Sequence, residues 1–149
     1  MAQKLLILLF FFGSFVMKSQ NLVWKTNLND AIVLSNEQKK PLLIYFTAAG
    51  VSQKFEEELF RTPDFAVWSR DNVILLKLDL SNTTISDAEK EQNVKVKNAF
   101  GVTELPQICL ALASIKKLKT TFNALGKVPY NPAGVRAWII DANGVLRPE

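Results

Sequence analysis

Few residues of this 149-residue chain could do chemistry. Cys109 is its only cysteine, and it contains no histidine. The chain therefore cannot form a Ser–His or Cys–His nucleophile pair, an imidazole zinc site or an intramolecular disulfide. Cys109 falls in the apolar segment 106–114, where a free cysteine usually packs as a small apolar residue. We expect Cys109 to belong to the core, and we expect no metal and no cofactor.

Acidic and hydroxyl side chains gather after the turn 45–52, which reads YFTAAGVS. The three glutamates at 56–58 are consecutive, and consecutive helical residues point in different directions, so we expect a solvated face and not an acid pair. A helix is predicted to begin near Val51 or Ser52. Its free N–H groups, from Gly50 onward, could hold a carboxylate or a peptide carbonyl. The simpler interpretation is that Ser52 caps this helix.

Hydrophobic periodicity predicts a single α/β domain in the order β-α-β-α-β-α-β-β-α, with helices on both faces of a mixed sheet. The three tryptophans, at 24, 68 and 138, fall in apolar patterns and are expected in the core or at its rim. Strands are predicted at 21–24, 42–46, 72–80, 106–114 and 120–126. Helices are predicted at 27–40 behind a cap at Asn27 or Asn29, from 51 to a break at Pro63 and onward, at 86–100 and at 132–146. The third helix has an N-cap signature at 86–89 and is closed by Gly101.

Four segments carry a resemblance to a known family: KPLLIYFT, FEEELFRTPDF, VKNAFGVTELPQICL and the ending TFNALGKVPY to AGVRAWIIDANGVL. Together they resemble secreted thioredoxin-like proteins of the Bacteroidetes type over essentially the whole chain after its N-terminal segment. The resemblance implies a thioredoxin-like fold. It also implies that Pro106, in GVTELP, is a cis proline, and that Leu105 before it offers its backbone to an extended peptide.

The sequence departs from that family at the reactive site. Alignment backward from FEEELF places Ala49, Gly50, Val51 and Ser52 at the four positions of the family's C-x-x-C motif, so Ala49 and Ser52 stand where the cysteines would be. Tyr45 stands about where redox-active relatives keep a buried carboxylate. Disulfide exchange needs a thiolate as the attacking species, so the resemblance carries over the fold and not the reaction.

Three functional hypotheses follow. The first is a redox-inactive protein that binds a polypeptide partner by strand addition in the peptide groove, defined here as residues 49–52 with Leu105 and Pro106. The second is a thiol–disulfide oxidoreductase-related protein that acts through Cys109 alone. The third is a structural component of the cell envelope that uses a helical face. We favour the first, with an envelope protein or peptide as the partner.

The N-terminal segment resembles a secretory signal peptide. Lys4 precedes an apolar run of 13 residues and the polar exit KSQ, and that run is shorter than the roughly 20 residues of a membrane span. We expect cleavage after Ser19, which leaves a domain at 20–149 that is periplasmic or secreted and has no stable membrane span; the alternative is an uncleaved anchor. The net charge of +4 comes without a basic stripe, so nucleic acid binding has no support.

Overall fold

The computed structural model describes residues 22–149, so the predicted signal peptide at 1–19 lies outside the described residues. The element order confirms the prediction. The strands are β1 (Trp24–Lys25), β2 (Leu42–Thr47), β3 (Ile74–Asp79), β4 (Gln107–Lys116) and β5 (Lys119–Lys127). The helices are α2 (Leu28–Gln38), η1 (Phe55–Phe60), α3 (Pro63–Asn72), α4 (Asp87–Ala99) and α5 (Val135–Leu146). Within the described part, no helix is long and apolar enough to cross a membrane.

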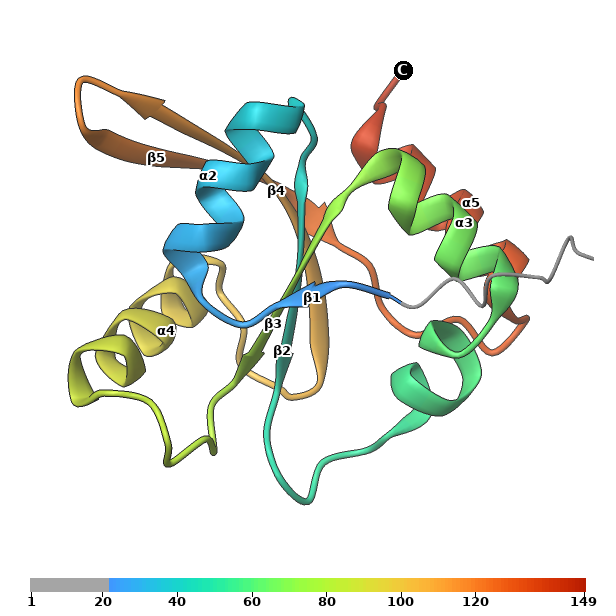
Figure 1. The fold of residues 1–149 in the computed structure, drawn as a ribbon. Helices are drawn as coiled ribbons and strands as arrows, with labels where there is room; N and C mark the ends of the chain where they lie inside the picture. The colour runs from blue at the N-terminus through green and yellow to red at the C-terminus, as the bar shows by residue number, and fades with distance from the viewer. Residues whose placement is uncertain (1–21) are drawn as a thin grey trace, which may run out of the picture.

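The strands form one mixed sheet in the order β1-β3-β2-β4-β5 (Figure 1). Strands β1 and β2 run parallel to β3, while β4 runs antiparallel to both β2 and β5. Every residue of the central strand β2 is buried. Its continuous apolar run is the pattern of a strand that is covered on both faces, so the predicted fold class is confirmed.

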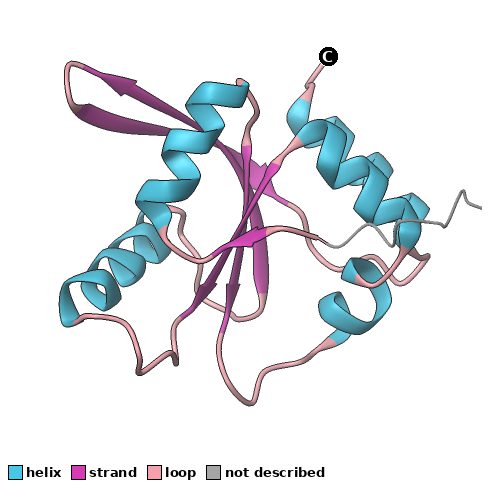
Figure 2. Ribbon diagram, viewed as in Figure 1, coloured by secondary structure: helices cyan, strands magenta, loops and turns pink. Residues whose placement is uncertain are grey.

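Helices cover the two faces of the sheet separately, with α2 and α4 on one side and η1, α3 and α5 on the other (Figure 2). Alternate side chains of β2 point to opposite faces. Leu42, Ile44 and Phe46 pack under α2 and α4, in what we call the α2/α4 core. Leu43 and Tyr45 pack under η1, α3 and α5, in what we call the α3/α5 core.

Side chains near the helix starts satisfy backbone N–H groups that have no partner inside the helix. Asn27 accepts a hydrogen bond from the Asp30 N–H at 3.1 Å, as predicted. Ser86 and Glu89 form a reciprocal capping box at the start of α4, which confirms the signature in the sequence. After α4, Gly101 takes the left-handed conformation (φ 65°) that ends the helix where the sequence predicts.

Three predicted starts were wrong, and one of them is that of α5, which begins at Val135 and not at 132. The first strand covers Trp24 and Lys25 and not 21–24. The helix expected from Val51 or Ser52 begins instead around Phe55, and the turn before it contains Gly50 in a left-handed conformation (φ 80°). This helix is also a π-helix, whose i→i+5 hydrogen bonds place residues five apart on neighbouring turns. Phe55 and Phe60 accordingly stack with their ring centroids 6.2 Å apart.

Candidate functional site

The residues predicted to form the peptide groove lie at the edge of the sheet where β2 ends and β4 begins. Phe46 pairs with Gln107 across these strands, so the residues beyond this pair, Thr47 and Pro106, meet at the same edge. The peptide bond between Leu105 and Pro106 is cis, as the resemblance implies. The structure therefore brings the two parts of the predicted groove together from positions more than fifty residues apart.

The turn that follows β2 is tied to the loop that follows β3. The Ala49 N–H donates to the Ser81 hydroxyl at 2.8 Å, and Ser81 in turn hydrogen-bonds the Asp79 carboxylate through its hydroxyl and its N–H. The Leu80 N–H donates to the Thr47 carbonyl at 2.8 Å. These bonds fix the start of the turn and leave Gly50 and Val51 at its exposed end. Ser81 was not found from the sequence, because its loop carries no family motif.

At Leu105 the side chain packs inward, while the backbone N–H and C=O have no hydrogen-bond partner among the described residues. The side chain is half-buried and packs against the α2/α4 core. Strand β4 begins only at Gln107, and no hydrogen bond connects the Leu105 N–H or C=O to another described residue. Unpaired backbone groups at a strand edge are what strand addition requires. Across the groove, Ala49, Gly50 and Ser52 are exposed and Val51 is half-buried.

The structure corrects the roles predicted for Ser52 and for the start of the helix. Ser52 does not cap η1; its hydroxyl only accepts a long, 3.4 Å hydrogen bond from the Lys54 N–H. Gly50 and Val51 precede the helix by several residues, so they do not present its N–H groups. The anion site proposed for this turn is therefore wrong, because it required the helix to begin there.

Helix η1 is held to the domain by its side chains. Glu56 forms an ion pair with Lys77 of β3 at 3.0 Å. Glu58 accepts a hydrogen bond from the Tyr130 hydroxyl, and this bond raises the pKa of that phenol. Glu57 and Glu58 are exposed and Glu56 is half-buried, so the three glutamates lie at the surface as expected, while the partners of Glu56 and Glu58 were not predicted. The partners lie in distant segments, and helical spacing alone could not identify them.

An aromatic cluster fills the space beneath η1. Tyr45, 1% exposed, lies 4.9 Å from Phe60 and 6.0 Å from Phe55 between ring centroids, and Trp24 packs against Phe60. The Tyr45 hydroxyl has no hydrogen-bond partner among the described residues. Burial raises the pKa of this phenol above its ordinary value. The position is therefore occupied by a neutral aromatic side chain.

Cys109 lies inside the sheet and not in the groove. It pairs with Ile44 and Lys127 on the neighbouring strands and is 1% exposed. Burial raises the pKa of its thiol from 9.0 to about 11, against a smaller opposite influence from Lys127. A buried thiol that holds its proton so firmly is a weak nucleophile. Among the described residues, no three acidic or cysteine side chains group as metal ligands would.

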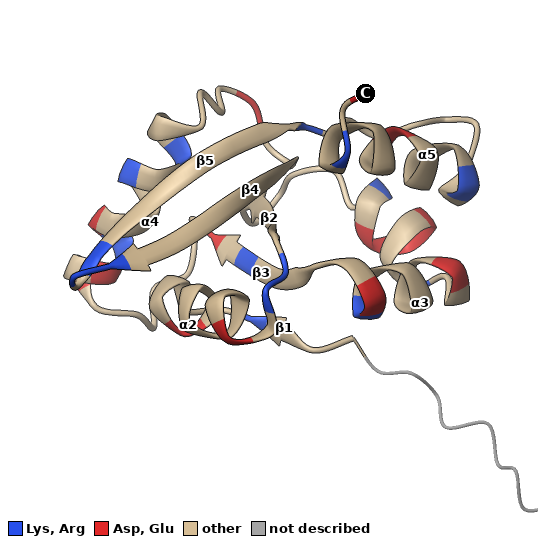
Figure 3. Cartoon of the chain, turned by 90° about the horizontal axis from the view of Figure 1, so that it is seen from above, with Lys and Arg blue, Asp and Glu red and all other residues tan. Residues whose placement is uncertain are grey.

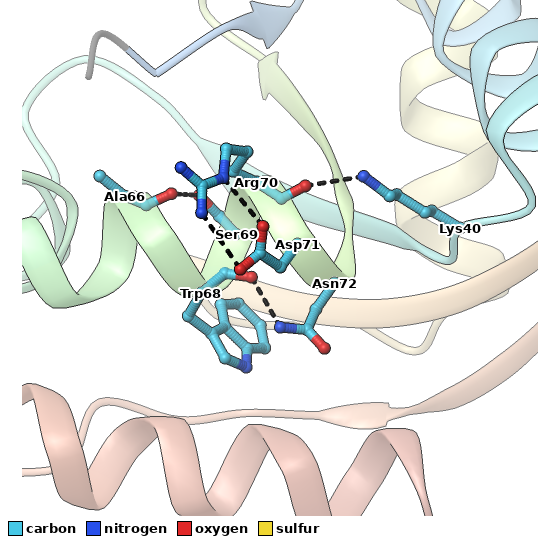
Figure 4. A network of polar contacts seen from close by, with 7 residues as sticks. All are labelled: Lys40, Ala66, Trp68, Ser69, Arg70, Asp71 and Asn72. Atoms are coloured by element: carbon cyan, nitrogen blue, oxygen red, sulfur yellow. Dashed lines mark hydrogen bonds and ion pairs between the residues drawn. The ribbon is translucent and has the colours of Figure 1, made fainter. Parts of the chain in front are cut away.

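A second hollow, of about 290 Å³, opens at the opposite edge of the sheet between α2 and α3. Its two cationic side chains already have partners, as Figure 4 shows. Lys40 donates to the Arg70 carbonyl at 2.7 Å, and Arg70 forms an ion pair with Asp71 at 2.8 Å. These contacts join the end of α3 to the turn before β2. The hollow therefore offers no unpaired charge to a ligand.

Comparison with known proteins shows which proteins the chain resembles. No family model matches it. The thioredoxin-related protein DsbJ of Chlamydia pneumoniae is 26% identical over 100 residues, which are 64% of this chain. The match spans only 28% of that relative's own length.

Solved structures match the whole arrangement of the domain. The structure of DsbH, an oxidoreductase, superposes with a TM-score of 0.69 at 17% identity and covers 87% of both chains. The fold is thioredoxin-like. A thioredoxin from Thermus thermophilus matches this thioredoxin-like domain with a TM-score of 0.57 at 11% identity, over 81% of this chain and 83% of its own. The oxidised C-terminal domain of DsbD from Neisseria meningitidis matches with a TM-score of 0.50 at 10% identity, over 77% of this chain and 89% of its own.

Proposed function

We propose that this thioredoxin-like protein binds an extended polypeptide in the peptide groove and performs no thiol–disulfide exchange. The observation that carries the proposal is the unpaired backbone of Leu105 beside a turn of small, uncharged residues. An extended segment could pair with the Leu105 N–H and C=O as an added strand, while its side chains rest on Val51 and Ala49. The polypeptide is expected in the cell envelope, where a cleaved signal peptide would deliver the protein.

The absence of exchange rests on the chemistry of the single thiol. A disulfide exchange step needs an accessible thiolate, and Cys109 is buried with a raised pKa. Two structural neighbours, the oxidoreductase DsbH and the DsbD domain in its oxidised form, show that this fold also accommodates redox proteins. In this chain the groove turn contains Ala49 and Ser52 in place of a cysteine pair, so recognition could be retained without the reaction.

Capture from the native envelope fraction tests the binding. The bait is the protein, compared with Val51→Asp, which places a charge in the groove, and with Val67→Asp, the same change at an exposed site on α3. We expect a partner that Val51→Asp loses and Val67→Asp retains. Equal capture by both variants would place the interface elsewhere. Leu105→Asp is informative only at an unchanged melting temperature, because its side chain also packs against the α2/α4 core.

Two thiol measurements test the redox part of the proposal. Reduction of insulin by dithiothreitol should proceed at the same rate with the protein, with Cys109→Ala and with buffer. In the folded protein, Cys109 should react with a thiol reagent much more slowly than in denaturant. Fast labelling of the folded protein would instead support the oxidoreductase hypothesis.

A further inference from the structure

The β4–β5 hairpin projects from the body of the domain (Figure 1). In β5 only Leu125 and Gly126 are partly buried, and the other residues are exposed. In β4 the residues from Leu112 onward lose the full burial of the preceding four. The outer half of the hairpin therefore contributes little to either core; its packing contacts come from Ala113 and from the Phe122 ring, 6.0 Å from Phe100, and not from the tip.

The tip of the hairpin, residues 115–119, is basic and apolar. Lys116, Lys117 and Lys119 surround Leu118, which is fully exposed, and the end of the hairpin is blue in Figure 3, the colour of basic residues. No acidic residue occurs in the sequence from 105 to 140. None of the three lysines forms an ion pair with another residue in the described range. Their charge is therefore available to a partner.

The turn at the tip is built from residues that local physics disfavours. Lys117 and Leu118 both have left-handed backbones, with φ of 50° and 65°. Two-residue hairpin turns of this kind strongly prefer Asn-Gly or similar pairs, and a bulky side chain is unusual there. A leucine at position 118 is therefore unfavourable for two reasons: its backbone is left-handed, and its apolar side chain is fully exposed. Such an outlier is a reason to look for a role outside folding.

We propose that this tip docks on a membrane surface rich in anionic phospholipid. Lysines near such a surface are attracted by its negative potential, and an apolar side chain at the leading point can enter the interface between headgroups and acyl chains. Leu118 is that leading point, with lysines on either side of it. Nucleic acid suits the tip less well, because residues 115–119 contain no aromatic or arginine side chain on which a base could stack.

A fluorophore whose emission depends on polarity, attached at the tip, tests the proposal in the full chain. Thr120→Cys takes the label beside the tip, and Glu57→Cys takes it on η1 as the matched control; labelled wild type corrects for any reaction at the buried Cys109. Because the readout is local, association of the rest of the chain with lipid does not imitate it. The probes are vesicles of phosphatidylcholine alone, vesicles that also contain phosphatidylglycerol, and a single-stranded oligonucleotide.

We expect a blue shift at position 120, and none at position 57, only on the vesicles with phosphatidylglycerol. Added salt should weaken it. Replacing Lys117 and Lys119 by Gln should lower the apparent affinity by about fivefold per lysine. Leu118→Ser should lower it by about tenfold.

Three results would overturn the proposal. The first is no shift at position 120 on the anionic vesicles. The second is an equal shift at positions 57 and 120, which would place the contact on the body of the domain. The third is a stronger response to the oligonucleotide that Leu118→Ser leaves unchanged, which would assign the basic tip to nucleic acid.

Discussion

The two halves of β4 differ although they belong to one continuous strand. From Ile108 to Ala111 the strand lies between β2 and β5 and is fully buried. From Leu112 to Lys116 its only neighbouring strand is β5, the Asn36 side chain of α2 bonds its backbone at Ala113 and Ile115, and its residues are half-buried or exposed. The inner half therefore stabilises the domain, while the outer half is free to carry a function. The comparison teaches that apolar residues of this strand are fully buried only where it lies inside the sheet and under the helices.

The largest effect should come from a core leucine of the inner half. Leu110→Ala should lower the free energy of unfolding by about 2 to 5 kcal/mol, because it leaves a cavity under α5. Leu112→Ala, two residues along and 45% exposed, is the matched control and should cost less than about 1 kcal/mol. Urea unfolding measures both. Equal losses would mean that the two halves do not differ as described.

The thiol of Cys109, in the inner half of β4, should make the free energy of unfolding depend on pH. The pKa of Cys109 is about 11 in the folded protein and 9.0 ordinarily, so between these values the unfolded state holds fewer protons. The free energy of unfolding should therefore fall as the pH rises from 9 toward 11, by about 2 kcal/mol from this group. Unfolding curves of wild type and Cys109→Ala across this range check the prediction. An equal decline in both would contradict it.

The buried hydroxyl of Tyr45, beneath η1, should lower the free energy of unfolding. Tyr45→Phe removes a polar group that has no described partner and should raise the free energy of unfolding by about 1 kcal/mol. Tyr130→Phe is the control and should lower the free energy of unfolding, because that hydroxyl donates a hydrogen bond to Glu58. Thermal unfolding distinguishes the two. A loss of stability in Tyr45→Phe would show that the hydroxyl is satisfied in solution.

The smallest change in the free energy of unfolding should come from the tip of the hairpin, beyond the outer half of β4. Leu118→Gly replaces a fully exposed leucine whose backbone is left-handed, and glycine adopts that conformation without steric cost. The free energy of unfolding should rise by about 0.5 kcal/mol or stay unchanged. The same variant should bind anionic vesicles less well. A clear loss of stability would return Leu118 to a structural role.

The sequence predicted the architecture well because apolar runs and helix caps are local signals. The run at β2, the cap at Asn27 and the capping box at Ser86 each appear within a few residues. It missed the late start of η1, which follows a turn whose beginning is held by a distant loop. The loop residue is Ser81, 32 positions from the Ala49 that it binds. Contacts over such distances have no periodic signature.

The candidate site was predicted in part for the same reason. The resemblance identified Pro106 and the turn at 49–52, and the fold brings them to one edge. It did not reveal that the Leu105 side chain packs inward while its backbone stays unpaired. The inward packing explains why the strand addition expected from the sequence would use the Leu105 backbone and not its side chain.

Amide hydrogen exchange of the protein, alone and with its captured polypeptide, tests the central claim most directly. If the polypeptide adds as a strand in the groove, exchange should slow at the Leu105 N–H and across 49–52, because the Leu105 amide gains a hydrogen-bond acceptor. Unchanged exchange at Leu105, with protection on a helical face instead, would contradict the account and favour a structural envelope component.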